Sequence, residues 1–263
     1  MEFTLDEMRE HLAALEARIG EACKIAGRSR ESVKLVWVSK FHPAEAVENA
    51  IALGATDFGE NRVQEAELKF SEPRTAKDGS RVRCHVIGPV QSNKLKKAAL
   101  VADCIHSIAS IEAVEKLEKV CAAAANGQGK ILDILFQVNA GEEETKSGLD
   151  VHEAEAFLND LAAKAGAAVD GKSENFPHLR FRGLMTIGKN TGVPEDSREC
   201  FAFLRGLRDK FLAKGGAFAK FDQLSMGMTL DLEVAIEEGS TMIRVGTALF
   251  GERDYSKPVN DPV

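Results

Sequence analysis

The sequence is poor in the residue patterns that mark disulfide-rich and zinc-binding proteins. Only five cysteines are spread over 263 residues, and no two of them have CxxC spacing. We interpret them as reduced thiols of a cytoplasmic protein, with neither a disulfide framework nor a metal site. These cysteines are Cys23, Cys84, Cys104, Cys121 and Cys200.

Long apolar runs and an excess of basic residues are also missing. No run reaches the roughly 18 residues of a membrane span, and the acidic, amphipathic stretch 1–19 lacks the basic and apolar regions of a signal peptide. The chain has 41 acidic and 34 basic residues and a net charge of −7, whereas a general nucleic-acid binder is basic. We therefore expect neither a membrane nor a nucleic acid as a partner. A local basic pocket for a small anion is compatible with this charge.

The sequence does contain a regular alternation of apolar runs and helical patterns. Helices are expected at 5–27, 43–54, 62–72, 92–102, 110–125, 151–166, 194–215 and 230–239, with Ser92 and Ser110 as N-cap candidates. Strands are expected at 33–39, 56–61, 81–88, 104–108, 131–139, 180–187, 221–227 and 241–251, the last with its closing turn. Segments 168–179 and 188–194 are expected to be loops, and the tail from about 256 to 263 to be mobile.

This alternation predicts an α/β fold with a parallel sheet and helices outside it. Eight such units favour a single (β/α)8 TIM-type barrel, which commonly has about 250 residues, over a doubly wound sheet. No GxGxxG follows the first strand, so a dinucleotide-binding fold has little support. Without a Pro- or Ser-rich linker, we expect residues 1–263 to form one domain.

Polar residues gather at the carboxyl ends of the predicted strands, where such barrels carry their chemistry. The first strand ends in Lys40 and the second in Asn61. Lys40 has two interpretations: an amine that reaches solvent, or a neutral amine that forms a Schiff base. His85, inside the third strand, is either a structural histidine or a base.

The loops after the seventh and eighth strands are where these barrels commonly bind phosphate. "SMGMT" (225–229) and "RVGT" (244–247) contain glycines, which let backbone N–H groups approach an anion, and hydroxyl donors. A tight turn explains each glycine equally well when it is taken alone. Two such loops at these two strands favour a phosphate site, whose candidates are Ser225, Gly227, Gly246 and Thr247.

Arg244 lies between two apolar residues of the eighth strand, so strand alternation points it into the barrel. A buried guanidinium needs a partner, either a barrel carboxylate such as Glu60 or an acceptor on a ligand, such as a ring nitrogen. Lys40, a phosphate site and Arg244 together fit a phosphorylated aldehyde. A Schiff-base lyase for a phosphorylated sugar is one reading, although aldolase barrels place that lysine on a late strand.

Several segments, in this order between about residues 33 and 257, resemble the pyridoxal phosphate homeostasis protein family (YggS/PROSC type). They are "VSKFHP", "FGENRVQEA", "HVIGPVQSNK", "CIHSI", "QVNAGEEETKSG", "RGLMTIG", "SMGMTLDLEVAIEEGSTMIRVGTALFG" and "RDYSK". The resemblance implies an alanine-racemase-like barrel of fold type III, without the C-terminal β-domain. It also implies pyridoxal 5′-phosphate (PLP) held as a Schiff base on Lys40.

The resemblance assigns expected roles to the other candidates. Arg244 would face the pyridine nitrogen, Asn61 would lie near the ring, and His85 would lie in a motif at the mouth. Phosphate contacts would come from Ser225, Gly227, Gly246 and Thr247. No metal is expected.

In function, the resemblance implies intracellular vitamin B6 (PLP) homeostasis without robust catalytic activity. Apo forms of PLP enzymes are the candidate recipients, and a monomer is expected. The alternative is a PLP-dependent, racemase-like enzyme acting on amino acids. Two-base racemases of this fold type use a tyrosine opposite the lysine, whereas the only tyrosine here is Tyr255, in the tail.

Two basic features have no assigned role. Arg62 follows "GEN" where other members of the family carry tyrosine, and it either adds charge at the mouth or covers a helix face. Lys94, Lys96 and Lys97 are a hypothetical second site for PLP in transit, although a solvated helix face is the simpler interpretation.

Overall fold

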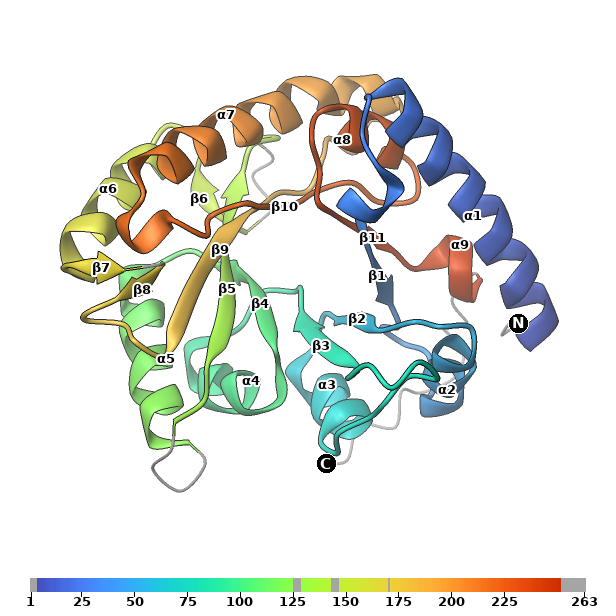
Figure 1. The fold of residues 1–263 in the computed structure, drawn as a ribbon, viewed down its shortest axis with the longest axis horizontal. Helices are drawn as coiled ribbons and strands as arrows, with labels where there is room; N and C mark the ends of the chain where they lie inside the picture. Colours follow the sequence, from blue (N-terminus) through green and yellow to red (C-terminus); the bar gives the residue numbers. More distant parts are fainter. Residues whose placement is uncertain (1–3, 125–128, 143–146, 170, 252–263) are drawn as a thin grey trace.

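The computed structural model describes residues 4–124, 129–142, 147–169 and 171–251. Within them, eight parallel strands close into a barrel, because each strand pairs with the next one along the chain and the last pairs with the first. Helices surround this ring of strands (Figure 1). The predicted (β/α)8 barrel is confirmed.

The eight barrel strands all overlap their predicted ranges, and their bodies are largely buried, as expected for a parallel sheet. They are β1 (Lys34–Val38), β2 (Asp57–Glu60), β3 (Arg83–Val86), β4 (Cys104–Ile108), β5 (Leu132–Asn139), β9 (Leu179–Met185), β10 (Gln223–Ser225) and β11 (Met242–Val245).

The eight predicted helices are also present, several of them shorter than expected. The α-helices are α1 (Leu5–Ile25), α2 (Ala44–Ala52), α3 (Val63–Phe70), α4 (Leu95–Val101), α5 (Ile111–Ala123), α6 (Ala154–Ala165), α7 (Arg198–Lys214), α8 (Leu232–Glu237) and α9 (Thr247–Phe250). Short 3-10 helices occur at η1 (Arg30–Ser32), η2 (Ser92–Lys94), η4 (Pro194–Ser197) and η5 (Gly216–Phe218).

Helix starts follow local capping chemistry. Thr4 and Glu7 form a reciprocal capping box at α1, and the Ser110 hydroxyl accepts the backbone N–H of Ala113 at α5, as predicted. The prediction for Ser92 is wrong. Ser92 is the first residue of the 3-10 turn η2, whose N-cap is Gln91, and α4 begins only at Leu95 with Lys94 as its N-cap.

Four short elements depart from the predicted order. A two-residue strand, β6 (Leu149–Asp150), extends the sheet beside β5. The segment expected to be a loop contains the antiparallel pair β7 (Ala168–Val169) and β8 (Lys172–Ser173). The chain after β11 forms the short helix α9 where only a turn was predicted. The tail at 256–263 and Tyr255 lie outside the described residues.

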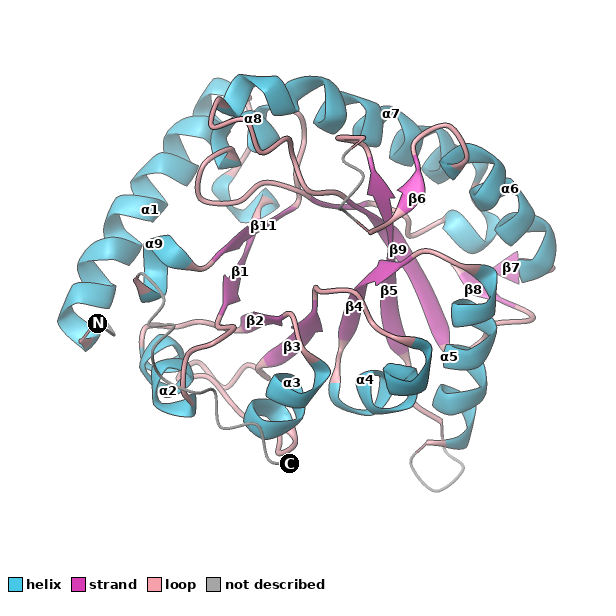
Figure 2. Ribbon diagram, turned by 180° about the vertical axis from the view of Figure 1, so that it is seen from behind, coloured by secondary structure: helices cyan, strands magenta, loops and turns pink. Residues whose placement is uncertain are grey.

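The N-terminal helix α1 lies along the outside of the barrel against α8 and α9 (Figure 2). Its buried face includes Met8, Leu15 and Ile19. All five cysteines are buried, each on a different element. Across the described segments, no helix combines the length and the apolar character needed to cross a membrane.

Candidate functional site

A cavity of about 470 Å³ opens at the carboxyl ends of the barrel strands. Because the strands are parallel, the loops that follow them meet at this one end of the barrel. The cavity is lined by Val38, Lys40, Asn61, Ile87, Gly88, Pro89, Gln137, Ser147, Met185, Ile187, Met228, Thr229, Leu230, Arg244, Gly246 and Thr247. Five of the eight predicted site residues are therefore brought together here.

Lys40 lies two residues after the end of β1 and is half-buried in the wall of this cavity. Gly246 lets the loop after β11 close against the end of β1. A Cβ atom on Gly246 would lie 3.0 Å from the carbonyl oxygen of Val38, two residues before Lys40. The absence of a side chain at Gly246 thus brings the last strand's loop next to Lys40.

The loops after β10 and β11 both reach the cavity, as expected for a phosphate site. Thr229 and Thr247 line it, whereas Gly227 does not. Gly227 has φ of +94°, and a Cβ there would lie 2.5 Å from the Cβ of Ala235. Its role is to let the chain turn tightly between β10 and α8. Asp231, and not Thr229, occupies the N-cap position of α8.

Arg244 is the only buried cation in the cavity wall among the described residues, and it has neutral partners. One guanidinium N–H donates to the Ser225 hydroxyl and another to the backbone oxygen of Thr186, and each of the two donor–acceptor distances is 2.8 Å. Burial lowers the pKa of Arg244 to about 10. Glu60 was the carboxylate considered for this position, but it pairs with Lys69.

Ser225 and His85 lie behind the wall, in a buried hydrogen-bonded chain across the barrel interior. The Ser225 hydroxyl is 2.9 Å from Nδ1 of His106, and Nε2 of His106 is 2.8 Å from Nδ1 of His85. Nε2 of His85 is 2.9 Å from the carboxylate of Asp57. The chain therefore links β2, β3, β4 and β10 to Arg244 on β11.

One assignment of protons satisfies every group in this chain. Arg244 can only donate to Ser225, so the Ser225 hydroxyl donates to His106 and each histidine donates through Nε2. In the reverse direction, the Ser225 proton would have no acceptor among the described residues, and His85 would add a second charge near Arg244. Burial, with His85 and Arg244 nearby, also holds the pKa of His106 well below 6.5. His106 is therefore neutral, and both histidines are held within this chain of hydrogen bonds.

Asp57 anchors the far end of the chain as a carboxylate. Burial alone would raise the pKa of Asp57, but hydrogen bonds from His85 and Lys34 hold it below its usual value. The chain therefore runs from an anion near the amino ends of the strands to the Arg244 cation at the cavity. This arrangement fixes the position of Arg244.

Several cavity residues were not among the predicted site residues. Strand alternation in β5 predicts that Gln137 points into the barrel. Nothing in the sequence distinguishes its amide from an ordinary polar group of a barrel interior. Met185, at the end of β9, and Ser147, between β5 and β6, lie in segments that resemble the family, but neither was assigned a role there. Met228 and Leu230 are exposed apolar residues of the loop after β10, where the sequence pattern drew attention to Ser225 and the glycines.

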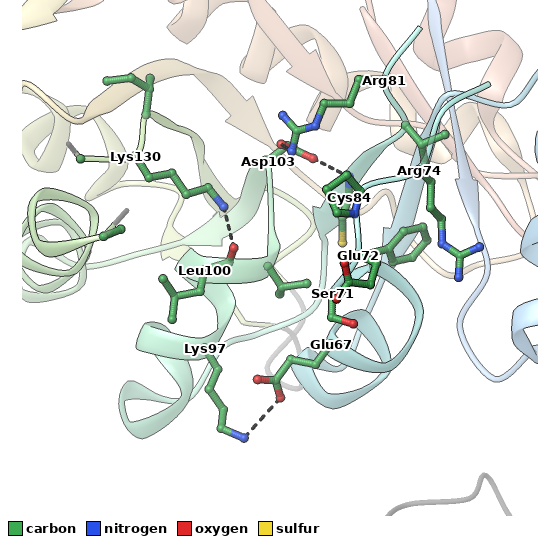
Figure 3. Close-up of a pocket in the computed structure, with 17 residues that line it drawn as sticks. Glu67, Ser71, Glu72, Arg74, Arg81, Cys84, Lys97, Leu100, Asp103 and Lys130 are labelled. Atoms are coloured by element: carbon green, nitrogen blue, oxygen red, sulfur yellow. Dashed lines mark hydrogen bonds and ion pairs between the residues drawn. The ribbon is translucent and has the colours of Figure 1, made fainter. Parts of the chain in front are cut away.

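A second cavity, of about 700 Å³, lies at the amino ends of β3 and β5, beside α3 and α4 (Figure 3). Its cations already have partners. Arg81 pairs with Asp103 at a distance of 2.7 Å, and Lys97 pairs with Glu67 at a distance of 3.3 Å. Lys130 donates to the backbone oxygens of Leu100 and Ala102. Carboxylates therefore compensate the charges of Arg81 and Lys97, whereas Lys130 is held by backbone oxygens alone.

The two remaining basic features lie outside the first cavity's wall. The Arg62 guanidinium stacks over the Phe41 ring, 5.3 Å from its centroid. Lys96 is exposed and Lys97 is paired with Glu67, in keeping with a solvated helix face. The hypothesis of a second PLP site at Lys94, Lys96 and Lys97 stays a prediction.

Comparison with known proteins defines first the class and then the family. The family model described as "alanine racemase, N-terminal domain" matches residues 11–254. The chain superposes on alanine racemase of Clostridium difficile with a TM-score of 0.66 at 13% identity, covering 97% of this chain and 58% of the racemase chain. The barrel is therefore of the alanine racemase N-terminal type.

Closer relatives are whole chains of similar length. The "pyridoxal phosphate homeostasis protein" of Pseudomonas aeruginosa is 38% identical over 97% of this chain and 100% of its own. PipY of Synechococcus elongatus, solved with PLP bound, is 31% identical with a TM-score of 0.72, covering 93% of this chain and 100% of PipY. The chain belongs to the pyridoxal phosphate homeostasis protein family.

Proposed function

We propose that this protein binds PLP in the cavity at the carboxyl ends of the strands and acts in intracellular vitamin B6 homeostasis. In this proposal it holds the cofactor on Lys40 without robust catalytic activity. The observation that carries the proposal is the combination of Lys40, the buried Arg244 and two strand-end loops around one cavity. The related PipY of Synechococcus elongatus was solved with PLP bound.

The residues present suit the chemical groups of PLP. Arg244 is a buried cation that donates to two neutral oxygens, so it can serve an acceptor on a ligand ring. Thr229, Gly246 and Thr247 would hold the phosphate, and Asn61 would lie beside the ring. When bound, PLP supplies an aldehyde, which a primary amine such as that of Lys40 converts into a C=N link with loss of one water.

The lining of the cavity supports a holder of cofactor over a racemase. Among the described residues of the wall, Lys40 and Arg244 are the only ionisable ones. Arg244 holds its proton far above neutral pH, so the described part of the wall offers Lys40 no second acid or base. A two-base exchange of an α-proton requires such a partner, which is why racemase-like chemistry stays the alternative.

The remaining expectations belong to the same proposal. They are a single domain over 1–263, a monomer in the cytoplasm, and apo PLP enzymes as recipients of the cofactor. The absence of ionisable groups other than Lys40 and Arg244 in the described wall suits storage, because a reactive ligand is then held without a proton acceptor beside it.

Titration with PLP, followed by absorbance, tests the proposal. The wild type should develop the visible band of a lysine–PLP adduct, and Lys40→Ala should not. Lys97→Ala, which removes an exposed lysine of α4, is the matched control and should behave as the wild type. Amino acids added to the loaded protein in D₂O should exchange their α-proton no faster than with free PLP. A wild type without the band contradicts PLP binding, and rapid Lys40-dependent exchange contradicts a non-catalytic role.

A further inference from the structure

A buried ionic cluster lies directly beneath the turn that carries Lys40. It consists of Lys69 and Glu65 on α3 and Glu60 at the end of β2, all with side chains at most 4% exposed. The Lys69 ammonium lies 2.8 Å from Oε1 of Glu60 and 3.5 Å from Oε2 of Glu65. None of these three residues lines either of the two cavities described above.

Each member of the cluster holds the chain on one side of Lys40. Lys69 donates to the backbone oxygen of Ser39 at a distance of 2.7 Å, and the Ser39 hydroxyl donates to Glu60 at a distance of 2.6 Å. On the other side of Lys40, the backbone N–H of Phe41 donates to Oε2 of Glu65 at a distance of 2.7 Å. The residues before and after Lys40 are thus fixed by charge-assisted hydrogen bonds.

The turn itself is strained. Phe41 has φ of +66°, in the left-handed region that residues with a side chain rarely adopt. Such a conformation costs about 1 kcal/mol or more and persists only where the surroundings enforce it. The bond from Phe41 to Glu65 provides that enforcement, and it sets the direction in which the chain leaves Lys40.

Stability alone does not explain the cluster. Two carboxylates share one ammonium, and within the described residues Oε2 of Glu60 and Oε1 of Glu65 have no hydrogen-bond partner. Burial raises the pKa of Glu60 to about 7, so the site can retain one proton and be neutral. Buried ion clusters are often less stabilising than apolar residues of the same volume, so a different benefit is expected here.

We propose that Glu60, Glu65 and Lys69 are positioning residues, which hold the turn at Ser39–Phe41 so that Lys40 meets an aldehyde bound in the cavity. The proposal rests on the proposed function, because it concerns how Lys40 receives PLP. None of the three side chains lines the cavity. It acts through the backbone on both sides of Lys40.

Two ligands separate positioning of Lys40 from general damage to the site. PLP has the aldehyde that reacts with Lys40, whereas pyridoxine 5′-phosphate has an alcohol in its place and reports only on the rest of the cavity. Their dissociation constants are to be measured by calorimetry, and formation of the PLP adduct by absorbance. Glu65→Leu removes the acceptor for Phe41, and Glu65→Gln keeps an amide oxygen at that place.

Two further variants guard against misfolding as an explanation. Phe41→Gly leaves every buried charge in place and folds without strain, but it frees the turn because glycine accepts many conformations. Lys130→Met is the matched control. Lys130 is another partly buried lysine that donates to backbone oxygens, and these oxygens are remote from Lys40.

Glu65→Leu and Phe41→Gly should weaken PLP binding on the order of tenfold or more, since small misplacements of a reacting group have large effects. Binding of pyridoxine 5′-phosphate should stay within about twofold in every variant, Glu65→Gln should recover most of the loss, and Lys130→Met should match the wild type. An equal loss for both ligands, or no loss for either, overturns the positioning role. A wild type that binds neither ligand contradicts the proposed function itself.

Discussion

Substitution of Glu60 by glutamine should change how the stability of the protein depends on pH. Burial raises the pKa of Glu60 from 4.5 to about 7 in the folded state, although Lys69 and Ser39 oppose this rise. A carboxyl with a raised pKa binds more protons in the folded than in the unfolded protein. It therefore stabilises the fold fully below pH 4.5, and this contribution is lost as the pH rises through 7.

The size of the effect follows from the pKa shift. One pKa unit corresponds to about 1.4 kcal/mol, so the full shift is worth up to about 3 kcal/mol between pH 5 and 8. Glu60→Gln removes the titration and keeps an oxygen that can accept from Ser39 and Lys69. Over this range the wild type should lose up to about 3 kcal/mol relative to the variant.

Urea unfolding followed by circular dichroism at several pH values measures this difference. His106 acts in the opposite direction, because its lowered pKa adds stability above pH 6.5 that is lost as the pH falls. Subtracting the Glu60→Gln curve from that of the wild type removes this contribution. Parallel curves between pH 5 and 8 would refute the reasoning, since Glu60 would then be ionised throughout.

Three further substitutions probe other parts of the site. Gly227→Ala should lower the free energy of unfolding by about 1–3 kcal/mol, seen as a lower Tm, because φ is +94° and a Cβ would crowd Ala235. His106→Leu should cost about 2–4 kcal/mol in urea unfolding, because it leaves the buried Ser225 hydroxyl proton without its acceptor and Nδ1 of His85 without its donor. Arg18→Ala should cost under about 1 kcal/mol, yet weaken PLP binding several-fold, because Arg18 donates to the backbone oxygen of Thr229. An unchanged Tm in Gly227→Ala would contradict the reasoning about that turn. The same holds for an unchanged free energy of unfolding in His106→Leu and for an unchanged PLP affinity in Arg18→Ala.

Much of the fold could be predicted because eight repeats of one pattern carry more information than any single element. The errors fall on short pieces. The strands β6, β7 and β8 have two residues each, too few to show alternation, and their pairing depends on tertiary contacts. The helix α9 was missed because a four-residue helix is indistinguishable from a turn in sequence.

The site could be predicted where position along a strand decides the outcome. Lys40, Asn61 and Arg244 reach the cavity because parallel strands end together. Prediction was less informative for Ser225 and His85, whose surroundings depend on contacts between strands that are distant in sequence.

The cluster beneath Lys40 was hidden for a different reason. Glu65 and Lys69 have the four-residue spacing of an ordinary pair on a helix surface, and nothing in the sequence shows that α3 buries them. Glu60 was considered only as a partner for Arg244. Its actual partners, Lys69 and Ser39, follow from how α3 packs against the ends of β1 and β2.

Borohydride reduction of the protein mixed with PLP, followed by peptide mapping, tests the central claim most directly. Reduction converts the C=N link into a stable amine, so the labelled lysine can be identified. We expect one pyridoxyl group on Lys40, with none on the peptide that carries Lys94, Lys96 and Lys97. A label elsewhere with Lys40 unmodified, or no label at all, would contradict the assignment of this cavity as the PLP site.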